Sequence, residues 1–180
     1  MGHKHTKAEI LDAAVETAFD DGLGQLSFGR VAKRLGISDR IVVYYFPTKD
    51  DLVAEVLVAL GARLQHALAP AFSSPADDHL ELARAAWPVL AHADTDAVFA
   101  LFFEAAGLAS IGREPYRTLV PQLIEGWISW ASGFVRGSKQ RRRAEAEATV
   151  ALIDGLLLFR QLAGPDTAQR AARRLGVGRR

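Results

Sequence analysis

The turn Gly36-Ile37-Ser38 constrains the fold more than any other stretch of this 180-residue chain. Glycine adopts the left-handed backbone that ends a helix without penalty, and Ser38 can cap the start of the next helix. Before the turn, apolar residues recur at helical spacing on one face: Phe28, Val31, Ala32 and Leu35. After it, a short segment runs to about Tyr45. Two short helices joined by a tight glycine turn are typical of a helix-turn-helix, whose second helix enters the major groove of DNA.

Another amphipathic helix precedes this pair. Its apolar stripe consists of Ile10, Leu11, Ala14, Val15, Ala18 and Phe19. Thr6-Lys7-Ala8-Glu9 has the form of a capping box, and Gly22 or Gly24 is expected to end the helix. We therefore predict a three-helix DNA-binding domain over residues 1–51.

Positive charge gathers on the predicted helix-turn-helix. The whole chain has a net charge of +1, but Ser27 to Lys49 holds five Lys and Arg residues against one Asp. A basic stretch of this kind is typical of a surface that meets DNA, and it is equally compatible with an ordinary solvated face. The charge alone does not separate these two interpretations.

The rest of the chain predicts more helices and no strands. Thr48 is expected to cap a long helix to about Ala69, roughly 30 Å at 1.5 Å per residue. Further helices are predicted over residues 75–91, 94–109, 114–135, 144–163 and 166–175, with Ser74 and Pro75 opening the first and a basic loop at 136–143. The predicted fold is all-α: the small domain is joined through the long helix to a larger helical domain, residues 52–180.

Several functional classes find no support in the sequence. There is no cysteine, and the five histidines show no metal-ligand spacing. No phosphate loop, nucleophile elbow or dinucleotide fingerprint is present. No signal peptide and no run of about 18 apolar residues is seen. We expect a cytoplasmic protein that is not an enzyme and has no cofactor, metal site or membrane span.

One family resemblance rests on specific residues. Gly36-Ile37-Ser38, followed by Tyr44-Tyr45-Phe46-Pro47-Thr48-Lys49-Asp50-Asp51-Leu52, resembles the DNA-binding signature of the tetracycline-repressor (TetR) family, over about Lys7 to Leu60. The remainder resembles that family only in helical layout and in Ile153-Asp154-Gly155-Leu156, an element of its dimer-forming helix. The resemblance implies a homodimeric repressor that binds a palindromic operator in double-stranded DNA and is released by a small molecule held in the larger domain.

The resemblance also assigns roles within the signature. It implies that Tyr44 and Tyr45 meet phosphate or base and that Lys49 meets phosphate. Arg40, Val43 and Gly29 depart from the family pattern; Arg40 could read a guanine with two hydrogen bonds, and Val43 could touch a thymine methyl. Val42 and Phe46 are expected in the core. The predicted DNA-binding residues are Ser27, Ser38, Asp39, Arg40, Val43, Tyr44, Tyr45 and Lys49.

Aromatic residues of the larger domain could line a ligand pocket, although an ordinary helical core explains them as well. The predicted pocket residues are Trp87, Phe99, Phe102, Phe103, Glu104, Trp127 and Trp130. Small and aliphatic residues predict the dimer face at about residues 144–175. An alternative hypothesis is an all-helical small-molecule-binding or enzymatic protein whose N-terminal helices serve dimerisation; it predicts no DNA affinity at low salt.

Overall fold

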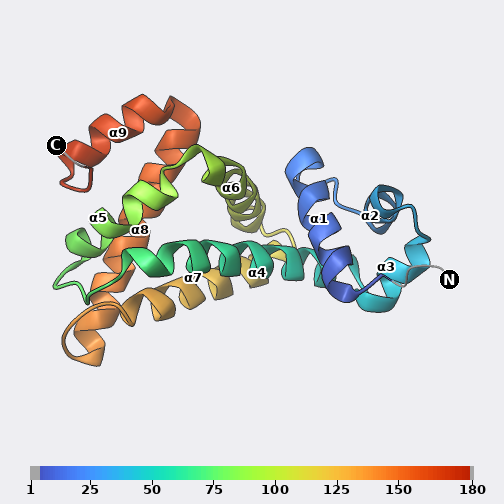
Figure 1. The fold of residues 1–180 in the computed structure, drawn as a ribbon, viewed down its shortest axis with the longest axis horizontal. Helices are drawn as coiled ribbons and strands as arrows, with labels where there is room; N and C mark the ends of the chain where they lie inside the picture. Colours follow the sequence, from blue (N-terminus) through green and yellow to red (C-terminus); the bar gives the residue numbers. More distant parts are fainter. Residues whose placement is uncertain (1–4, 179–180) are drawn as a thin grey trace. The chain divides into compact units, whose positions relative to one another are not determined.

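The computed structural model describes residues 5–178, so His3 and the end of the basic tail, 179–180, lie outside the described residues. The described chain is helical, as predicted, with no strand beyond one isolated bridge (Figure 1). The helices are α1 (Lys7–Asp21), α2 (Phe28–Leu35), α3 (Asp39–Tyr45), α4 (Lys49–Leu68), α5 (His79–Leu90), α6 (Asp96–Ser110), α7 (Tyr116–Ser132), α8 (Lys139–Ala163) and α9 (Pro165–Arg174), with short 3-10 turns at Ala69–Ala71 and Ala93–Thr95.

The chain forms two compact units. The first contains Met1–Ala62 and Leu101–Val120, and the second contains Arg63–Ala100 and Pro121–Arg180. The predicted division into residues 1–51 and 52–180 stays a prediction.

Local capping explains the helices of the N-terminal segment, residues 5–46. The Thr6 hydroxyl accepts the Glu9 N–H at 3.2 Å, and the Glu9 carboxylate accepts the Thr6 N–H at 2.8 Å, which completes the predicted capping box. Ser27 caps α2, and Gly36 ends it in the left-handed conformation at φ 66°. Ser38 caps α3. The predicted three-helix arrangement is confirmed, with α2 packed between α1 and α3.

The core of this segment is apolar and includes Val42 and Phe46 as predicted. Their side chains are 0% and 1% exposed, although Val42 lies on α3 and Phe46 directly follows it, among the candidate DNA-binding residues. Ile10, Val15 and Val31 from the two preceding helices are also fully buried. One side of α3 therefore packs into the core of this segment, and the other side remains exposed.

Helix α4 supplies the long connecting helix, and Thr48 caps it through a reciprocal pair of hydrogen bonds with Asp51, each 3.0 Å long. Among the described residues, Lys49–Ala71 is the one segment long and apolar enough to cross a membrane by length and composition alone. A helix in the core of a folded domain can have the same length and apolar composition. Seven of the leucine and valine residues of α4 are buried within the protein, and Val58 is 53% exposed. The buried ones are Leu52, Val53, Val56, Leu57, Leu60, Leu64 and Leu68.

In the second unit, the predicted start of α5 at Ser74 and Pro75 is wrong. The helix begins at His79, because the Asp78 side chain accepts the Glu81 N–H at 2.8 Å and caps it. The preceding Ala76 instead pairs with the chain after α7: its N–H donates to the Phe134 carbonyl at 2.8 Å. Pro88 lies inside α5, near its end at Leu90.

This pairing also corrects the predicted ends of α7 and α8. Helix α7 stops at Ser132 rather than near Val135, which forms the bridge to Ala76. The predicted basic loop at 136–143 is mostly helix, since Ser138 caps α8 and Lys139 begins it. Helix α9 begins at Pro165 rather than at residue 166, because proline suits the first helical position.

Helix α8 is the central element of the second unit, where it packs against α5 and α9. The side chain of its Arg160 is partly buried and donates to both carboxylate oxygens of Asp96 at 2.6 and 2.8 Å. His79 at the start of α5 is linked to Glu145 by a 2.8 Å contact between Nδ1 and the carboxylate. These pairs hold α8 to α6 and α5.

Asp154 on α8 makes stability depend on pH. Burial raises the pKa of its carboxyl from 3.8 to about 6. The folded state then binds more protons than the unfolded state between these values, so this group's contribution to stability falls as pH rises through them. Asp154→Asn should be more stable than the wild type at pH 8 by roughly 2–3 kcal/mol, at 1.36 kcal/mol per pKa unit. Urea unfolding at one fixed protein concentration measures this.

The difference between Asp154→Asn and the wild type should shrink towards zero near pH 4, where both side chains are neutral. A stabilisation of equal size at pH 4 and pH 8 would show that desolvation of the carboxylate is not its cause.

Candidate nucleic-acid interface

The outer face of α3 is exposed and carries most of the predicted DNA-binding residues. Tyr44 is 79% exposed and Val43 40% exposed, and Arg40 is also exposed. Within residues 5–178, the Arg40 side chain forms no ion pair. Three different side chains that can contact bases are thus presented on one short helix with few contacts to their own protein.

Ser38, Asp39 and Tyr45 lie at the edges of this face. The Ser38 hydroxyl accepts the Arg40 N–H at 3.3 Å, so Ser38 serves as a cap, and Asp39 is exposed in the first turn. Tyr45 is half-buried, and its hydroxyl donates to the His5 carbonyl at 3.1 Å. Its ring meets the ring of Tyr44 edge-on at 5.0 Å. Tyr45 therefore supports Tyr44 and is less free to move.

Ile41 was missed by sequence reasoning. It is 39% exposed on α3, next to the fully buried Val42. The sequence did contain a signal for this exposure. Consecutive residues point to different sides of a helix, so Ile41 and Val42 cannot both face the core fully.

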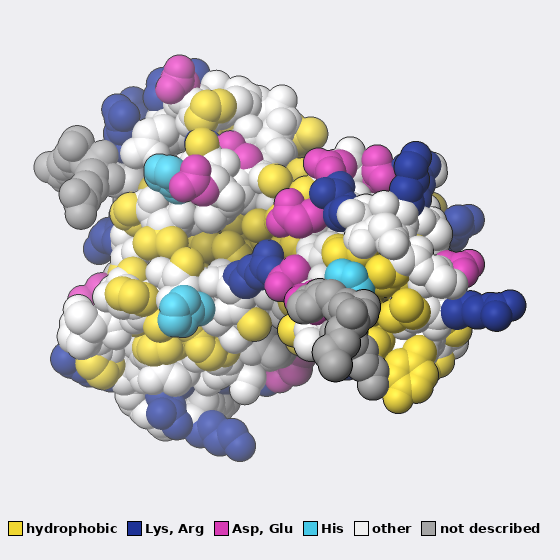
Figure 2. Space-filling view, turned by 45° about the vertical axis from the view of Figure 1, so that its right-hand side comes forward, with side chains coloured by type: hydrophobic (Ala, Val, Ile, Leu, Met, Phe, Trp, Pro, Cys, Tyr) yellow, Lys and Arg dark blue, Asp and Glu magenta, His cyan; other side chains and the backbone are white. Residues whose placement is uncertain are grey.

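Two of the five basic residues between Ser27 and Lys49 form ion pairs within the protein. Arg30 donates to Asp21 at 2.7 Å and to Gln25 at 3.3 Å, and Arg34 pairs with Asp20. Both ion pairs join α2 to the end of α1, and the hydrogen bond to Gln25 joins α2 to the connection after α1. On the face drawn in Figure 2, Lys and Arg side chains are interspersed with Asp and Glu. The net charge of this segment therefore overstates the charge available to phosphates.

Ser27 and Lys49 flank the α1–α2 connection, residues 22–27. The Ser27 hydroxyl caps α2 by accepting the Arg30 N–H at 3.4 Å. The Lys49 ammonium donates to the Gly24 carbonyl at 3.2 Å and remains largely exposed. Both side chains lie at helix starts, where backbone N–H groups favour anions.

The predicted pocket residues are divided between the two units. Trp87 and Phe99 are buried in the second unit, where the Trp87 ring nitrogen donates to Gln169 at 2.8 Å. Trp127 meets Trp130 edge-on at 5.4 Å. Phe102 and Phe103 belong to the first unit, with ring centroids 5.5 Å apart.

Trp130 packs on a core cluster of the second unit. It meets Phe72 at 5.6 Å and Phe134 at 4.8 Å between ring centroids, over a cluster of small buried residues that includes Ala131. This placement is what an ordinary helical core requires. A ligand-binding role for the predicted set stays a prediction.

Glu104, the polar member of the predicted pocket, forms hydrogen bonds with backbone groups of the first unit. Its carboxylate accepts the N–H groups of Leu23 and Gly24, both at 2.9 Å. The predicted polar group of the ligand pocket is thus bonded to the α1–α2 connection.

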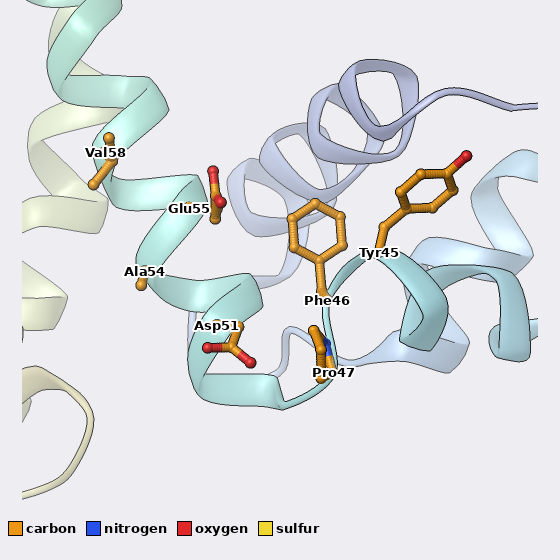
Figure 3. Close-up of a pocket in the computed structure, with 7 residues that line it drawn as sticks. All are labelled: Tyr45, Phe46, Pro47, Asp51, Ala54, Glu55 and Val58. Atoms are coloured by element: carbon orange, nitrogen blue, oxygen red, sulfur yellow. The ribbon is translucent and has the colours of Figure 1, made fainter.

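An open hollow of about 550 Å³ lies beside α3 and the start of α4, as Figure 3 shows. It contains none of the predicted pocket residues. It is lined by Tyr45, Phe46, Pro47, Asp51, Ala54, Glu55 and Val58. In the residues that the structure describes, no group of three or more His, Cys, Asp or Glu side chains could hold a metal ion.

Residues 10–56 match the family model of the bacterial regulatory proteins of the tetR family. This match coincides with the three capped helices and the start of α4. The N-terminal segment of the chain is thus similar to the DNA-binding part of the tetR family. No curated protein matches this sequence. Solved structures resemble it over nearly the whole chain.

A transcriptional regulator from Rhodococcus sp. Rha1 is 22% identical, with a TM-score of 0.71, over 93% of this chain and 91% of that one. A TetR transcription regulator from Haloarcula marismortui is 18% identical, with a TM-score of 0.70, over 93% and 94%. These two show the fold.

The multidrug binding protein EbrR, solved in complex with proflavin, is 28% identical, with a TM-score of 0.64, over 94% of this chain and 98% of that one. Helix α3, with its exposed outer face, lies inside the segment that matches the tetR family model.

Proposed function

We propose that this protein is a TetR-family transcriptional repressor that binds a palindromic operator as a homodimer and is released by a small molecule. One observation carries the proposal: α3 buries Val42 and presents Arg40, Val43 and the 79% exposed Tyr44 outward. These exposed side chains lie on the second helix of a helix-turn-helix, the element that enters the major groove in proteins with this motif.

Each exposed side chain suits a different part of the DNA. Arg40 can donate two hydrogen bonds to guanine O6 and N7, and Val43 can contact a thymine methyl. Tyr44 is proposed to meet phosphate or base. Lys49 and Ser27 are proposed to hold phosphates and so to fix the register of α3 in the major groove.

The proposed dimer face is the exposed apolar surface of α8 and the end of α9. Leu158 and Phe159 are 40% and 42% exposed, and Leu162 is 78% exposed. Leu175 beyond α9 adds another exposed aliphatic side chain. Side chains at positions 158, 159 and 162 share one side of a helix, and a two-fold axis would cover them with the same residues of a second copy.

Release by a ligand is supported by EbrR, which is a multidrug binding protein solved with proflavin. A ligand that binds better to the state with mis-spaced recognition helices would shift the population away from the operator-bound form. Helix α4 is the proposed carrier of this difference. A compound that raises the melting temperature and weakens operator binding would identify the ligand.

We further propose that the protein acts on DNA in the cytoplasm and catalyses no reaction. The residues with proposed roles bind or position, and none needs to exchange a proton or form a covalent bond.

Selection from random duplexes tests the proposed function. The full-length protein should enrich an inverted repeat whose half-sites lie about one helical turn, or a near multiple, apart. The proposal would be overturned if the recovered duplexes shared no sequence and if their affinity depended on the salt concentration but not on their sequence.

Arg40 and Lys49 are expected to differ in what they contribute. Arg40→Ala should weaken binding to the selected duplex by about 1–3 kcal/mol and relax the preference at one base position. Lys49→Ala should weaken binding to all duplexes alike and reduce the slope of log K against log[salt] by about 1. Fluorescence anisotropy on duplexes with single base changes separates these effects. An Arg40→Ala variant with unchanged base preferences would remove Arg40 from base recognition.

A further inference from the structure

A carboxylate from outside the helix-turn-helix holds the α1–α2 connection. Glu104 on α6 accepts the Leu23 N–H through Oε2 and the Gly24 N–H through Oε1, each at 2.9 Å. The residues are about 80 positions apart in sequence. Each oxygen of the carboxylate therefore satisfies one backbone amide, and charge-assisted hydrogen bonds of this kind are stronger than neutral ones.

The connection is shaped to receive this carboxylate. Gly22 has φ +82°, a backbone conformation that strains any residue with a side chain. A Cβ built at Gly22 would lie 3.2 Å from Glu104 Oε2, closer than most Cβ contacts. Glycine thus provides both the turn and the room for the carboxylate.

A second side chain meets the same connection from α4. The Lys49 ammonium donates to the Gly24 carbonyl at 3.2 Å, so side chains from two helices bond both sides of this residue. The start of α7 faces the site too: burial, followed by the nearby Glu104 and Asp50 carboxylates, raises the pKa of the Tyr116 hydroxyl.

We propose that Glu104 is a positioning residue for operator binding. By holding the Leu23 and Gly24 amides, it fixes the α1–α2 connection, and with it Ser27 and the start of α2, relative to Lys49. This inference rests on the proposed function, because its consequence is measured on the operator. Leu23 and Leu26 are fully buried in the connection, so the fold has an anchor that does not depend on the carboxylate.

Glu104→Ala tests the inference. The variant should fold, its amides at positions 23 and 24 should exchange with solvent faster, and its affinity for the selected duplex should fall roughly tenfold as two charge-assisted hydrogen bonds are lost. Glu104→Gln should recover part of the affinity, since its single carbonyl oxygen can still accept one amide. Glu125→Ala is the matched control, because that exposed carboxylate belongs to the second unit and pairs with Arg143 there.

A double-mutant cycle distinguishes positioning from a general loss of stability. Glu104 and Lys49 act on the same residue, Gly24, so Glu104→Ala with Lys49→Ala should weaken binding by clearly less than the product of the single effects. Effects that simply multiply would overturn the inference, as would unchanged affinity or unchanged exchange at positions 23 and 24 in Glu104→Ala. If the wild type itself bound no duplex specifically, the proposed function would fail first, and the inference with it.

Discussion

Replacing both Leu158 and Leu162 with Glu should make the protein a monomer and weaken its binding to the palindromic duplex by at least about a hundredfold, the scale of lost bivalency. Each leucine occurs twice in a symmetric interface, so the double substitution removes four apolar side chains and places four charges there. Burying one such side chain contributes roughly 1.5–3 kcal/mol, and burying an unpaired charge is strongly unfavourable. Sedimentation velocity and fluorescence anisotropy measure the two effects.

Ile111→Glu is the matched control for this variant. Ile111 is 73% exposed and lies after α6, away from α8 and α9 in the sequence. It should stay dimeric and bind the operator normally. A double variant of α8 that remains dimeric would show that the exposed apolar face of this helix is not the interface.

Phe46→Ala should destabilise the protein by about 3–5 kcal/mol, the usual range for a buried aromatic residue. Phe46 is 1% exposed at the end of α3, and the Lys7 ammonium lies 5.3 Å from its ring centroid. The expected loss combines the lost burial of the ring with the cavity that its removal would leave. Urea unfolding, monitored by far-UV circular dichroism, measures the loss in the free energy of unfolding.

Tyr44→Ala is the counterpart of Phe46→Ala two positions away. Because Tyr44 is 79% exposed, its removal should change stability by less than about 0.5 kcal/mol, as for most surface substitutions. It should nevertheless weaken operator binding by roughly 1–3 kcal/mol. A Tyr44→Ala variant that unfolds, or a Phe46→Ala variant as stable as the wild type, would contradict the division of α3 into a core side and a DNA side.

The sequence predicted the N-terminal helices well because their ends depend on local chemistry. Thr6, Ser27 and Ser38 cap helices through backbone groups within three residues, and Gly36 ends α2 by its own conformational freedom. Signals of this kind can be read without knowing the rest of the fold.

The ends of α5 and α7 depended on a distant contact and could not be predicted in this way. Ser74 and Pro75 have the form of a helix start, but Ala76 pairs with Val135, almost sixty residues away. Ser138 was a local signal that the run of arginines after it obscured: charged residues suit an exposed helix as well as a loop.

The candidate site shows the same limit. The outward positions of Arg40, Val43 and Tyr44 follow from helical periodicity once Val42 is assigned to the core. The ion pair between Arg30 and Asp21 depends on how α2 packs against α1, so the sequence does not show that Arg30 is already paired. The hydrogen bonds from the α1–α2 connection to Glu104 depend on a residue about 80 positions away, so the sequence does not show them either.

The ratio of affinities for the selected inverted repeat and for a shuffled duplex of equal length tests sequence-specific binding most directly. At about 0.15 M salt, where phosphate contacts alone bind weakly, the wild-type protein should prefer the repeat by roughly a thousandfold or more, with two chains per duplex. Equal affinity for both duplexes, falling in parallel as salt is raised, would contradict the assignment of α3 as a helix that reads bases.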